Sequence, residues 1–332
     1  MKLIFPKNGA RVDTHYPYQN IFLEKIRLEG IEKAVEWLEP IKAGREISYP
    51  APTFLEWESD DGEFTVELSR SSDFSDGAVI RTRAKRIPVF NLEIGAQYFW
   101  RVNGSEAHTF YTENNKFRFL FVEGVPNFRD LGGIKIKQGL LFRGGELERC
   151  YTVTERGKDT FCNQLGIRTE LDLRADMIGR VAESAAGKSV DLVQLPYRPY
   201  SEIFEEQHRQ GIVKIMELLA DESRYPVYFH CLGGADRTGM IALYLRALAG
   251  ESDNDIHTDY ELTSLSAYAM GLAEGARANG FRMRTSSYYS ECIGEIGKYA
   301  PGAPLSVSVR AFLLDCGVSE QTLDSIVRII KK

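Results

Sequence analysis

This chain of 332 residues lacks an apolar run approaching the roughly 20 residues that a membrane-spanning helix needs. Its first six residues, Met-Lys-Leu-Ile-Phe-Pro, are too short an apolar stretch for a signal peptide. We therefore expect no transmembrane segment and a cytoplasmic location. Secretion is the alternative if a signal peptide was removed before this numbering begins.

Cysteine, histidine and excess positive charge are also scarce. The five cysteines and five histidines are scattered, and no two cysteines form a C-x-x-C pair. This spacing predicts neither a disulfide framework nor a metal site. A net charge of −6 argues against a nucleic-acid partner, since such proteins usually present a basic face.

The first third of the chain has the pattern of short strands closed by turns. Phe64, Val66 and Leu68 alternate with polar residues, and a second alternating run ends at Asn103-Gly104, a strong hairpin signal. This pattern predicts an all-β sandwich over residues 1–118. A stretch at 21–38 has helical spacing, and we interpret it as an insertion or a packed decoration. The aromatic runs at 54–57 and 98–102 resemble those of fibronectin type III or immunoglobulin-like domains.

The remaining residues, 119–332, alternate between helices and strands. We expect a helix that begins with a capping box at 152–155 and ends near Gly166, followed by a strand at 167–173. A helical stripe at 212–219, a strand at 225–230 and a helix at 240–249 follow, and the last helix carries its stripe at 323–330. This alternation predicts an α/β domain whose central sheet is mostly parallel and flanked by helices.

The strongest chemical signal lies between the strand at 225–230 and the next helix. Five residues separate Cys231 from Arg237, and two of them, Gly233 and Gly234, lack a side chain. Such a loop forms a nest of backbone N–H groups, and the amino end of the following helix adds partial positive charge. The arginine fork matches two phosphoryl oxygens, and the same nest favours the thiolate form of Cys231. The pattern predicts nucleophilic attack on phosphorus that leaves a phosphocysteine, which water then hydrolyses. A lone cysteine at a strand end is more often structural, but its combination with the glycine pair, arginine and helix favours function.

The run His-Cys-x-x-Gly-x-Asp-Arg-Thr-Gly at 230–239 resembles the signature of the protein tyrosine phosphatase superfamily. The segments Asn-Phe-Arg-Asp-Leu-Gly-Gly at 127–133, Leu-Phe-Arg-Gly-Gly-Glu-Leu at 141–147 and Leu-Asp-Leu-Arg at 171–174 are similar to the bacterial tyrosine/serine phosphatases that carry an NFRD segment. The resemblance extends over roughly residues 119–332. It implies a protein-tyrosine or dual-specificity phosphatase that uses no metal or organic cofactor, with a phosphorylated protein or peptide as substrate and a phosphoinositide as the other possibility.

The resemblance also assigns roles within the loop. Cys231 corresponds to the nucleophile and Arg237 to the phosphate-binding arginine. Thr238 corresponds to the hydroxyl that eases departure of the thiolate. The remaining phosphate ligands are the backbone amides of Leu232, Gly233, Gly234, Ala235 and Asp236. Several relatives carry lysine where this chain has Ala235, and the missing cation favours phosphoproteins over highly charged inositol phosphates.

The general acid and the supporting residues are less directly indicated. Asp236 is our first candidate for the acid, with a helix N-cap as its alternative function. Glu202, in the segment 195–202 where some relatives place a mobile acidic loop, is the second candidate. His230 is expected to hydrogen-bond loop carbonyls, or only to pack at the strand end. Asp172 and Arg174 would orient the loop, or form a purely structural ion pair.

Two other functions fit part of this sequence pattern. A rhodanese-like sulfurtransferase also holds a cysteine in a cradle at a strand end, but its loop is typically shorter and lacks the Cys-x5-Arg-Thr frame. A non-catalytic phosphate-binding adaptor would need neither Cys231 nor Arg237, and both are present. In either case the β-sandwich could mediate contacts with other proteins.

Overall fold

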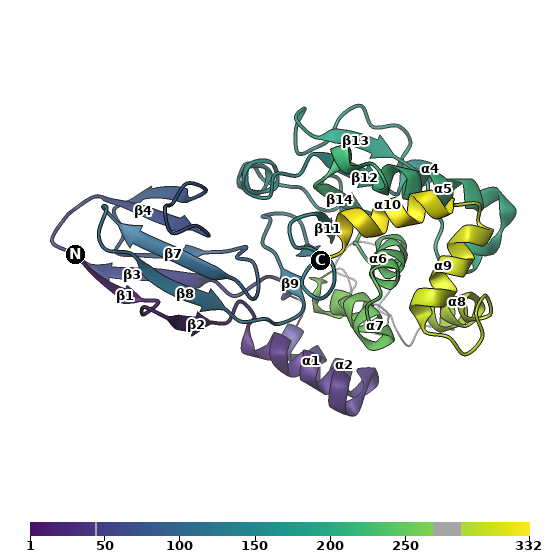
Figure 1. The fold of residues 1–332 in the computed structure, drawn as a ribbon, viewed down its shortest axis with the longest axis horizontal. Helices are drawn as coiled ribbons and strands as arrows, with labels where there is room; N and C mark the ends of the chain where they lie inside the picture. Colours follow the sequence, from purple (N-terminus) through teal and green to yellow (C-terminus); the bar gives the residue numbers. More distant parts are fainter. Residues whose placement is uncertain (44, 268–286) are drawn as a thin grey trace.

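The computed structural model describes residues 1–43, 45–267 and 287–332 of the chain. Figure 1 shows a strand-rich half, which contains the first eight strands and two helices, beside an α/β half that starts at β9. Both halves contain several helices or strands that pack around apolar residues, so each has a core of its own. No helix in these described ranges is long and apolar enough to cross a membrane.

The strand-rich half contains two sheets. The first has the order β1-β3-β6, built from Lys2–Phe5, Thr53–Glu58 and Arg86–Val89. The second has the order β2-β8-β7-β4-β5, built from Ala10–Val12, His108–Thr112, Gln97–Val102, Phe64–Ser69 and Ala78–Thr82. Leu55 and Trp57 of the first sheet share one core with Val66, Trp100 and Phe110 of the second. The predicted strands are therefore present, while the fibronectin III or immunoglobulin-like classification stays a prediction.

The helical stretch of this half forms two helices, α1 (Pro17–Glu29) and α2 (Ile31–Lys42). Their apolar side chains, Phe22 and Leu38 among them, are not part of the core between the two sheets. They pack in a separate core with Phe119, Leu262 and Leu265 of the α/β half. The predicted decoration thus joins the two halves (Figure 1).

The α/β half contains a six-stranded sheet of order β13-β12-β14-β11-β10-β9. These strands are Asp191–Gln194, Thr169–Asp172, Val227–His230, Leu141–Gly144, Arg129–Asp130 and Arg118–Phe119. The four from β13 to β11 pair in parallel, and the two short strands β10 and β9 pair antiparallel. The α/β class predicted from the sequence is confirmed, and β14 lies between two parallel neighbours, β12 and β11.

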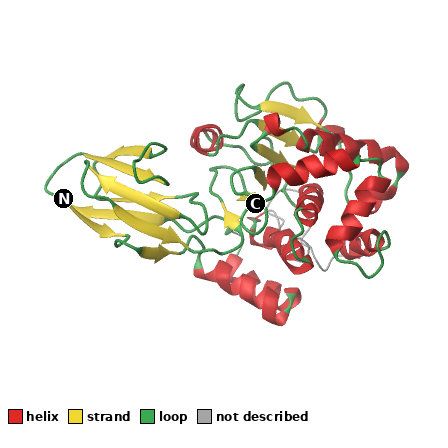
Figure 2. Ribbon diagram, viewed as in Figure 1, coloured by secondary structure: helices red, strands yellow, loops and turns green. Residues whose placement is uncertain are grey.

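Helices lie on both faces of this sheet (Figure 2). Successive residues of β14 face different cores: Val227 and Phe229 belong to a core shared with α6, whereas Tyr228 packs with Phe161 on the opposite side. The helices are α3 (Glu155–Asp159), η1 (Thr160–Gln164), α4 (Ala175–Ile178), η2 (Tyr200–Phe204), α5 (Glu206–Leu219), η3 (Glu222–Arg224), α6 (Asp236–Leu248), α7 (Asp253–Glu261), η4 (Leu262–Leu265), α8 (Ser287–Gly297), α9 (Leu305–Asp315) and α10 (Glu320–Ile330). Burial on both faces explains why the strand at 227–230 is continuously apolar or aromatic up to His230.

The bounds of several predicted elements need correction. The strand predicted at 225–230 is Val227–His230, and the helix predicted at 240–249 is Asp236–Leu248. The helix expected to start with a capping box at 152–155 begins at Glu155, and its N-cap is Thr154, whose hydroxyl accepts from the Gly157 N–H at 3.1 Å. The predicted N-cap, Thr152, lies two residues before the observed one, because either threonine fits an N-cap. The strand predicted at 167–173 is shorter, since only Thr169–Asp172 pairs with its neighbours.

Candidate active site

The predicted loop joins the carboxyl end of β14 to the amino end of α6. Cys231 follows directly after β14 and is 6% exposed, and Arg237 lies half-buried in the first turn of α6. The N-cap of α6 is Ala235, which has no side-chain capping bond. Asp236 is therefore the first helical residue, and its alternative interpretation as an N-cap is wrong. Because no side chain caps this end, its N–H groups remain suited to an anion.

Side chains donate three hydrogen bonds to the carbonyl groups of Gly233 and Gly234. The Asn127 side-chain amide donates to the carbonyls of Gly233 at 3.0 Å and Gly234 at 3.1 Å. The Arg143 guanidinium also donates to the Gly234 carbonyl, at 2.8 Å. Carbonyls fixed on the outer side of a tight loop leave its N–H groups for the inner side, which is the arrangement of an anion-binding nest.

Gly234 is a position where only glycine fits. Its φ of +66° lies in the left-handed region, and a Cβ atom there would lie 2.3 Å from the Gly144 carbonyl oxygen at the end of β11. The loop therefore packs directly against the neighbouring strand, backbone to backbone. This close approach also brings Arg143 within reach of the loop.

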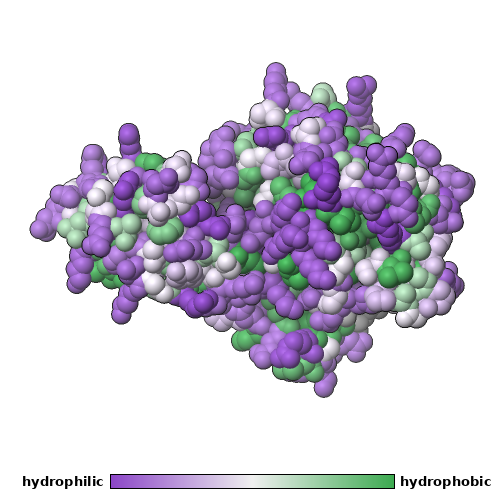
Figure 3. Space-filling view, in the orientation of Figure 1, coloured by the Kyte–Doolittle hydropathy of each residue, from purple (hydrophilic) through white to green (hydrophobic). Residues whose placement is uncertain are grey.

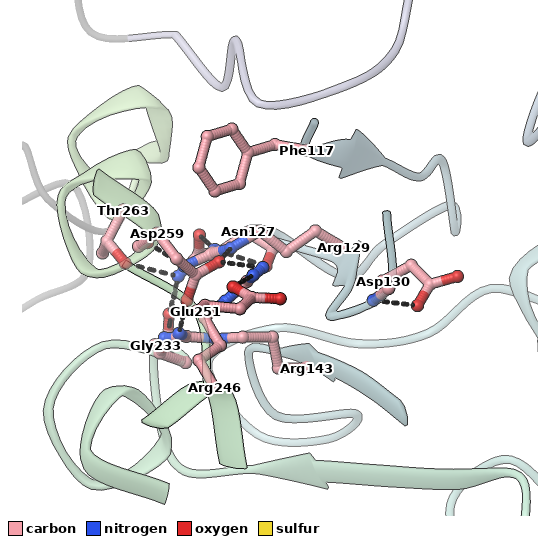
Figure 4. A network of polar contacts seen from close by, with 12 residues as sticks. Phe117, Asn127, Arg129, Asp130, Arg143, Gly233, Arg246, Glu251, Asp259 and Thr263 are labelled. Carbon is pink, nitrogen blue, oxygen red and sulfur yellow. Dashed lines mark hydrogen bonds and ion pairs between the residues drawn. The ribbon is translucent and has the colours of Figure 1, made fainter. Parts of the chain in front are cut away.

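A buried network of charges lies around the loop residue Gly233 (Figure 4). Asp259 of α7 accepts from Arg129 at 3.0 Å, Arg143 at 2.6 Å and Arg246 at 3.3 Å. Arg246 also pairs with Glu251 at 2.5 Å and lies over the ring of Phe117. Burial alone would raise the pKa of Asp259, but the three guanidinium groups outweigh it and lower that pKa.

The NFRD segment contributes Asn127 and Arg129 to the contacts around the loop, whereas its Asp130 has other partners. Asn127 reaches the loop, and its own side-chain oxygen accepts from Arg129 at 2.5 Å. Asp130 points elsewhere, where it accepts from Arg118 at 2.7 Å and from the N–H groups of Gly132 and Gly139, both at 2.7 Å. The segment thus braces the loop and an adjacent turn.

His230 lies buried at the end of β14 between two acceptors. Its Nδ1 is 3.0 Å from the Cys231 carbonyl, and its Nε2 is 2.8 Å from the Glu170 carboxylate. Burial would lower the pKa of His230, but the hydrogen bond and charge of Glu170 outweigh it and raise that pKa. With acceptors on both sides, the ring needs both protons, so an imidazolium directly behind the cysteine is favoured.

Asp172 and Arg174 form an ion pair at the end of β12. The guanidinium donates to Asp172 at 2.8 Å, to Glu148 at 2.5 Å and to Glu146. The Glu146 N–H donates to the Leu232 carbonyl at 2.9 Å. The pair therefore touches the loop through one intermediate residue, Glu146.

Asp236 contacts the segment 195–202 through an unexpected residue. The Tyr200 hydroxyl donates to the Asp236 carboxylate and is 2.5 Å from the Tyr260 hydroxyl. Burial raises the pKa of Asp236 above that of an ordinary aspartate. Glu202 lies apart from this cluster, 3.9 Å from Arg198 and 3.8 Å from His208.

The remaining loop residues differ in environment. Ala235 is buried, and its methyl group supplies no charge where several relatives have a lysine. The Thr238 hydroxyl is also buried and has no hydrogen-bond partner within the described ranges. An unpaired buried hydroxyl costs free energy, which points to a partner that arrives with substrate or during the reaction.

The strand-rich half reaches toward the site through the segment that follows α2. Lys42 donates to the Ser264 carbonyl at 2.7 Å, the Ile47 N–H donates to the Leu265 carbonyl at 3.1 Å, and Glu46 accepts from the Ala267 N–H at 2.7 Å. Thr263, the neighbour of these acceptors, lies 3.3 Å from the Asn127 amide that braces the loop. Burial lowers the pKa of Lys42 to about 7.

The sequence did not indicate several of these contacts. Asn127 and Arg143 lie in segments that were indicated only by resemblance, and Asp259 lies in no motif. Tyr200 lies in the segment 195–202, where Glu202 was the expected acid and the tyrosine was at most a residue of a phenol-accepting cleft. Each depends on a partner brought close by strand order or helix packing. The available signal was the pair Arg129 and Arg143, which lie opposite each other in β10 and β11. Two buried arginines need a carboxylate, and Asp259 supplies it.

One family profile matches the α/β half of the chain. A profile of the family described as "Tyrosine phosphatase family" matches residues 120–327. Among solved structures, the core catalytic domain of the PP-IP phosphatase Siw14 from S. cerevisiae, in complex with citrate, matches with a TM-score of 0.31 and 17% identity, over 49% of this chain and 90% of that one. A second structure of the Siw14 catalytic core has a TM-score of 0.29 and 17% identity, over 48% and 89%. These scores are too low to inform on substrate, and no curated protein matches. The family profile spans most of the chain, including the whole site, and the chain belongs to the tyrosine phosphatase family.

Proposed function

We propose that this phosphatase is a protein-tyrosine or dual-specificity enzyme that works through a phosphocysteine intermediate. One observation carries the proposal. Cys231 begins a loop whose Gly233 and Gly234 carbonyls accept hydrogen bonds from Asn127 and Arg143, and Arg237 lies in the first turn of the helix that follows. The nest, the helix end and the guanidinium would converge on one dianionic phosphoryl group.

In the first step the Cys231 thiolate attacks phosphorus. A sulfur–phosphorus bond forms while the bond from phosphorus to the leaving oxygen breaks. Arg237 and the loop amides stabilise the negative charge on the equatorial oxygens. The leaving oxygen takes the proton of Asp236, whose raised pKa favours the protonated carboxyl that this step needs.

In the second step water attacks the phosphocysteine. The water proton passes to the Asp236 carboxylate, the sulfur–phosphorus bond breaks, and inorganic phosphate leaves. Thr238 would donate to the departing thiolate, which gives its unpaired buried hydroxyl a partner. The His230 imidazolium and the Arg174–Asp172 pair would hold the two ends of the loop in place.

A phosphoprotein substrate is favoured over a phosphoinositide because the buried arginines near the loop are already paired with carboxylates. Arg129, Arg143 and Arg246 are all paired with Asp259 or Glu251, and Ala235 supplies no further charge. A stacked pair of tyrosines, Tyr200 and the 62% exposed Tyr288, lies beside Asp236 and offers an aromatic surface to a phenol ring.

The test is a panel of phosphotyrosine peptide, phosphoserine peptide, phosphoinositide and p-nitrophenyl phosphate. We expect the highest kcat/KM for the phosphotyrosine peptide and no turnover by Cys231→Ser. A preference for phosphoinositide would replace the substrate assignment without changing the mechanism. Full turnover by Cys231→Ser would overturn the mechanism, and an inactive wild-type chain that still binds phosphopeptide would favour the adaptor.

A further inference from the structure

Tyr200 is tightly fixed at a position that the mechanism does not yet explain. Its φ of +62° lies in the left-handed region, which non-glycine residues seldom adopt. Its ring stacks on Tyr288 at 6.1 Å, and its carbonyl accepts from the Cys292 thiol at 3.8 Å. Strained backbone that persists at a catalytic cleft is commonly tied to function.

The hydroxyl of Tyr200 stands between two partners. One is the Asp236 carboxylate, and the other is the Tyr260 hydroxyl of α7, at 2.5 Å. The Tyr260 ring packs closely on α6, because a Cβ atom at Gly239 would lie 2.5 Å from its Cε2. The glycine that ends the loop signature therefore makes room for this tyrosine.

The three groups form a chain whose direction depends on the proton of Asp236. Each hydroxyl has a single proton to donate. When Asp236 is ionised it only accepts, so Tyr200 donates to it and Tyr260 donates to Tyr200. When Asp236 is protonated it donates to Tyr200, and the order of donors reverses. The carboxyl keeps a partner in both protonation states.

We propose that Tyr200 is a positioning residue that holds the Asp236 carboxyl in line with the leaving oxygen through both steps of the reaction. This inference rests on the proposed function, because it needs Asp236 to be the general acid. The groups that face Asp236 are Tyr200 from η2, Tyr260 from α7 and Arg237 from its own helix, and Cys231 of the loop lies close enough to act on Tyr200.

The decisive variant is Tyr200→Phe in the full chain, assayed from acidic to basic pH. Phenyl phosphate has a leaving group that needs the proton, whereas that of p-nitrophenyl phosphate departs readily without one. We expect kcat for phenyl phosphate to fall roughly tenfold to hundredfold, and kcat for p-nitrophenyl phosphate to fall much less. Because the lost hydroxyl favoured the ionised carboxylate, the basic limb of the kcat profile should move to higher pH. Tyr260→Phe should move it in the same direction by less.

The matched control is Tyr225→Phe, which removes another buried hydroxyl, one that donates to the Leu219 carbonyl at 2.7 Å at the opposite end of β14. Its pH profile should match that of the wild type. If Tyr200→Phe lowers kcat for both substrates by the same factor at every pH, Tyr200 has only a structural role and the inference is wrong.

Asp236→Asn separates this inference from the proposal on which it rests. If that variant spares phenyl phosphate turnover, Asp236 is not the acid and this inference is wrong, while the phosphocysteine mechanism is judged separately by Cys231→Ser. If it lowers turnover selectively, adding Tyr200→Phe should cause little further selective loss, because the two residues act as one unit. Full additivity in the double variant would overturn the role of Tyr200 alone.

Discussion

The strand-rich half and the α/β half place their arginines in opposite environments. Arg101 pairs with Glu67 at 2.6 Å on the sheet surface, where the two side chains are 33% and 21% exposed. Arg129 and Arg143 are 2% and 0% exposed and share the buried Asp259. Hydrophilic side chains cover much of both halves (Figure 3), so the difference lies in what each half buries.

This contrast indicates what the buried charges are for. The strand-rich half is held together by apolar residues such as Trp57, Trp100 and Phe110, and that kind of core suffices for stability. Burying ion pairs costs desolvation that their attraction barely repays. The α/β half nevertheless buries a cluster of them beside one loop. Arg143 donates directly to the Gly234 carbonyl, and Arg129 donates to Asn127, whose amide donates to the same loop. We infer that the network serves the geometry of the loop.

The largest effect is expected from Asp259→Asn, which would break the contrast at its centre. Three buried guanidinium groups would lose their shared carboxylate, and removing one partner of a buried pair costs about 3–5 kcal/mol. Denaturant unfolding measures the loss, and kcat/KM should fall with it because Arg143 also holds Gly234. A variant that keeps both stability and activity would show that the network is dispensable.

Leu55→Ala tests the other half of the comparison. Leu55 is fully buried between the two sheets, and its truncation should lower the free energy of unfolding by about 2–5 kcal/mol. The kcat of the folded variant with p-nitrophenyl phosphate should equal that of the wild type. A fall in kcat at temperatures well below unfolding would mean that the sheets influence the loop.

Asn127→Ala should separate geometry from stability inside the α/β half. The Gly233 carbonyl would lose the Asn127 amide as donor, and the Gly234 carbonyl would keep only Arg143. We expect a loss of about 1–3 kcal/mol of stability, while kcat/KM falls by about 10²-fold through misplacement of the loop. Gln138→Ala is the control, because that amide braces the backbone of Ile94 away from the site, with both bonds at 2.9 Å. Equal effects of the two variants on kcat/KM would contradict the bracing role.

Glu67→Gln should have the smallest effect of all. The pair with Arg101 is bidentate but accessible to solvent and salt, so its loss should be hard to detect in thermal unfolding. Raising the ionic strength should reduce any remaining difference. A loss comparable to that of Asp259→Asn would show that exposure does not explain the contrast.

Local patterns predicted much of this molecule, and packing determined the rest. Alternating apolar and polar residues predicted β4 and β7. The loop signature alone predicted that Cys231 follows a strand and that Arg237 lies at the start of a helix. The partners of the loop could not be found this way. Asn127 meets Gly233 across 106 residues, and Tyr200 meets Asp236 across 36, because sheet order and helix packing bring them together.

The helix pair α1–α2 has a consequence for how the chain is made. It emerges from the ribosome early, yet the residues that cover its apolar face include Leu262 and Leu265, and Lys42 finds its acceptor 222 residues later. During synthesis this face must stay uncovered, or be shielded by a chaperone, until most of the second half has appeared. Contacts of such long range slow folding. The pair α1–α2 would thus dock only after residues 262–265 have been synthesised.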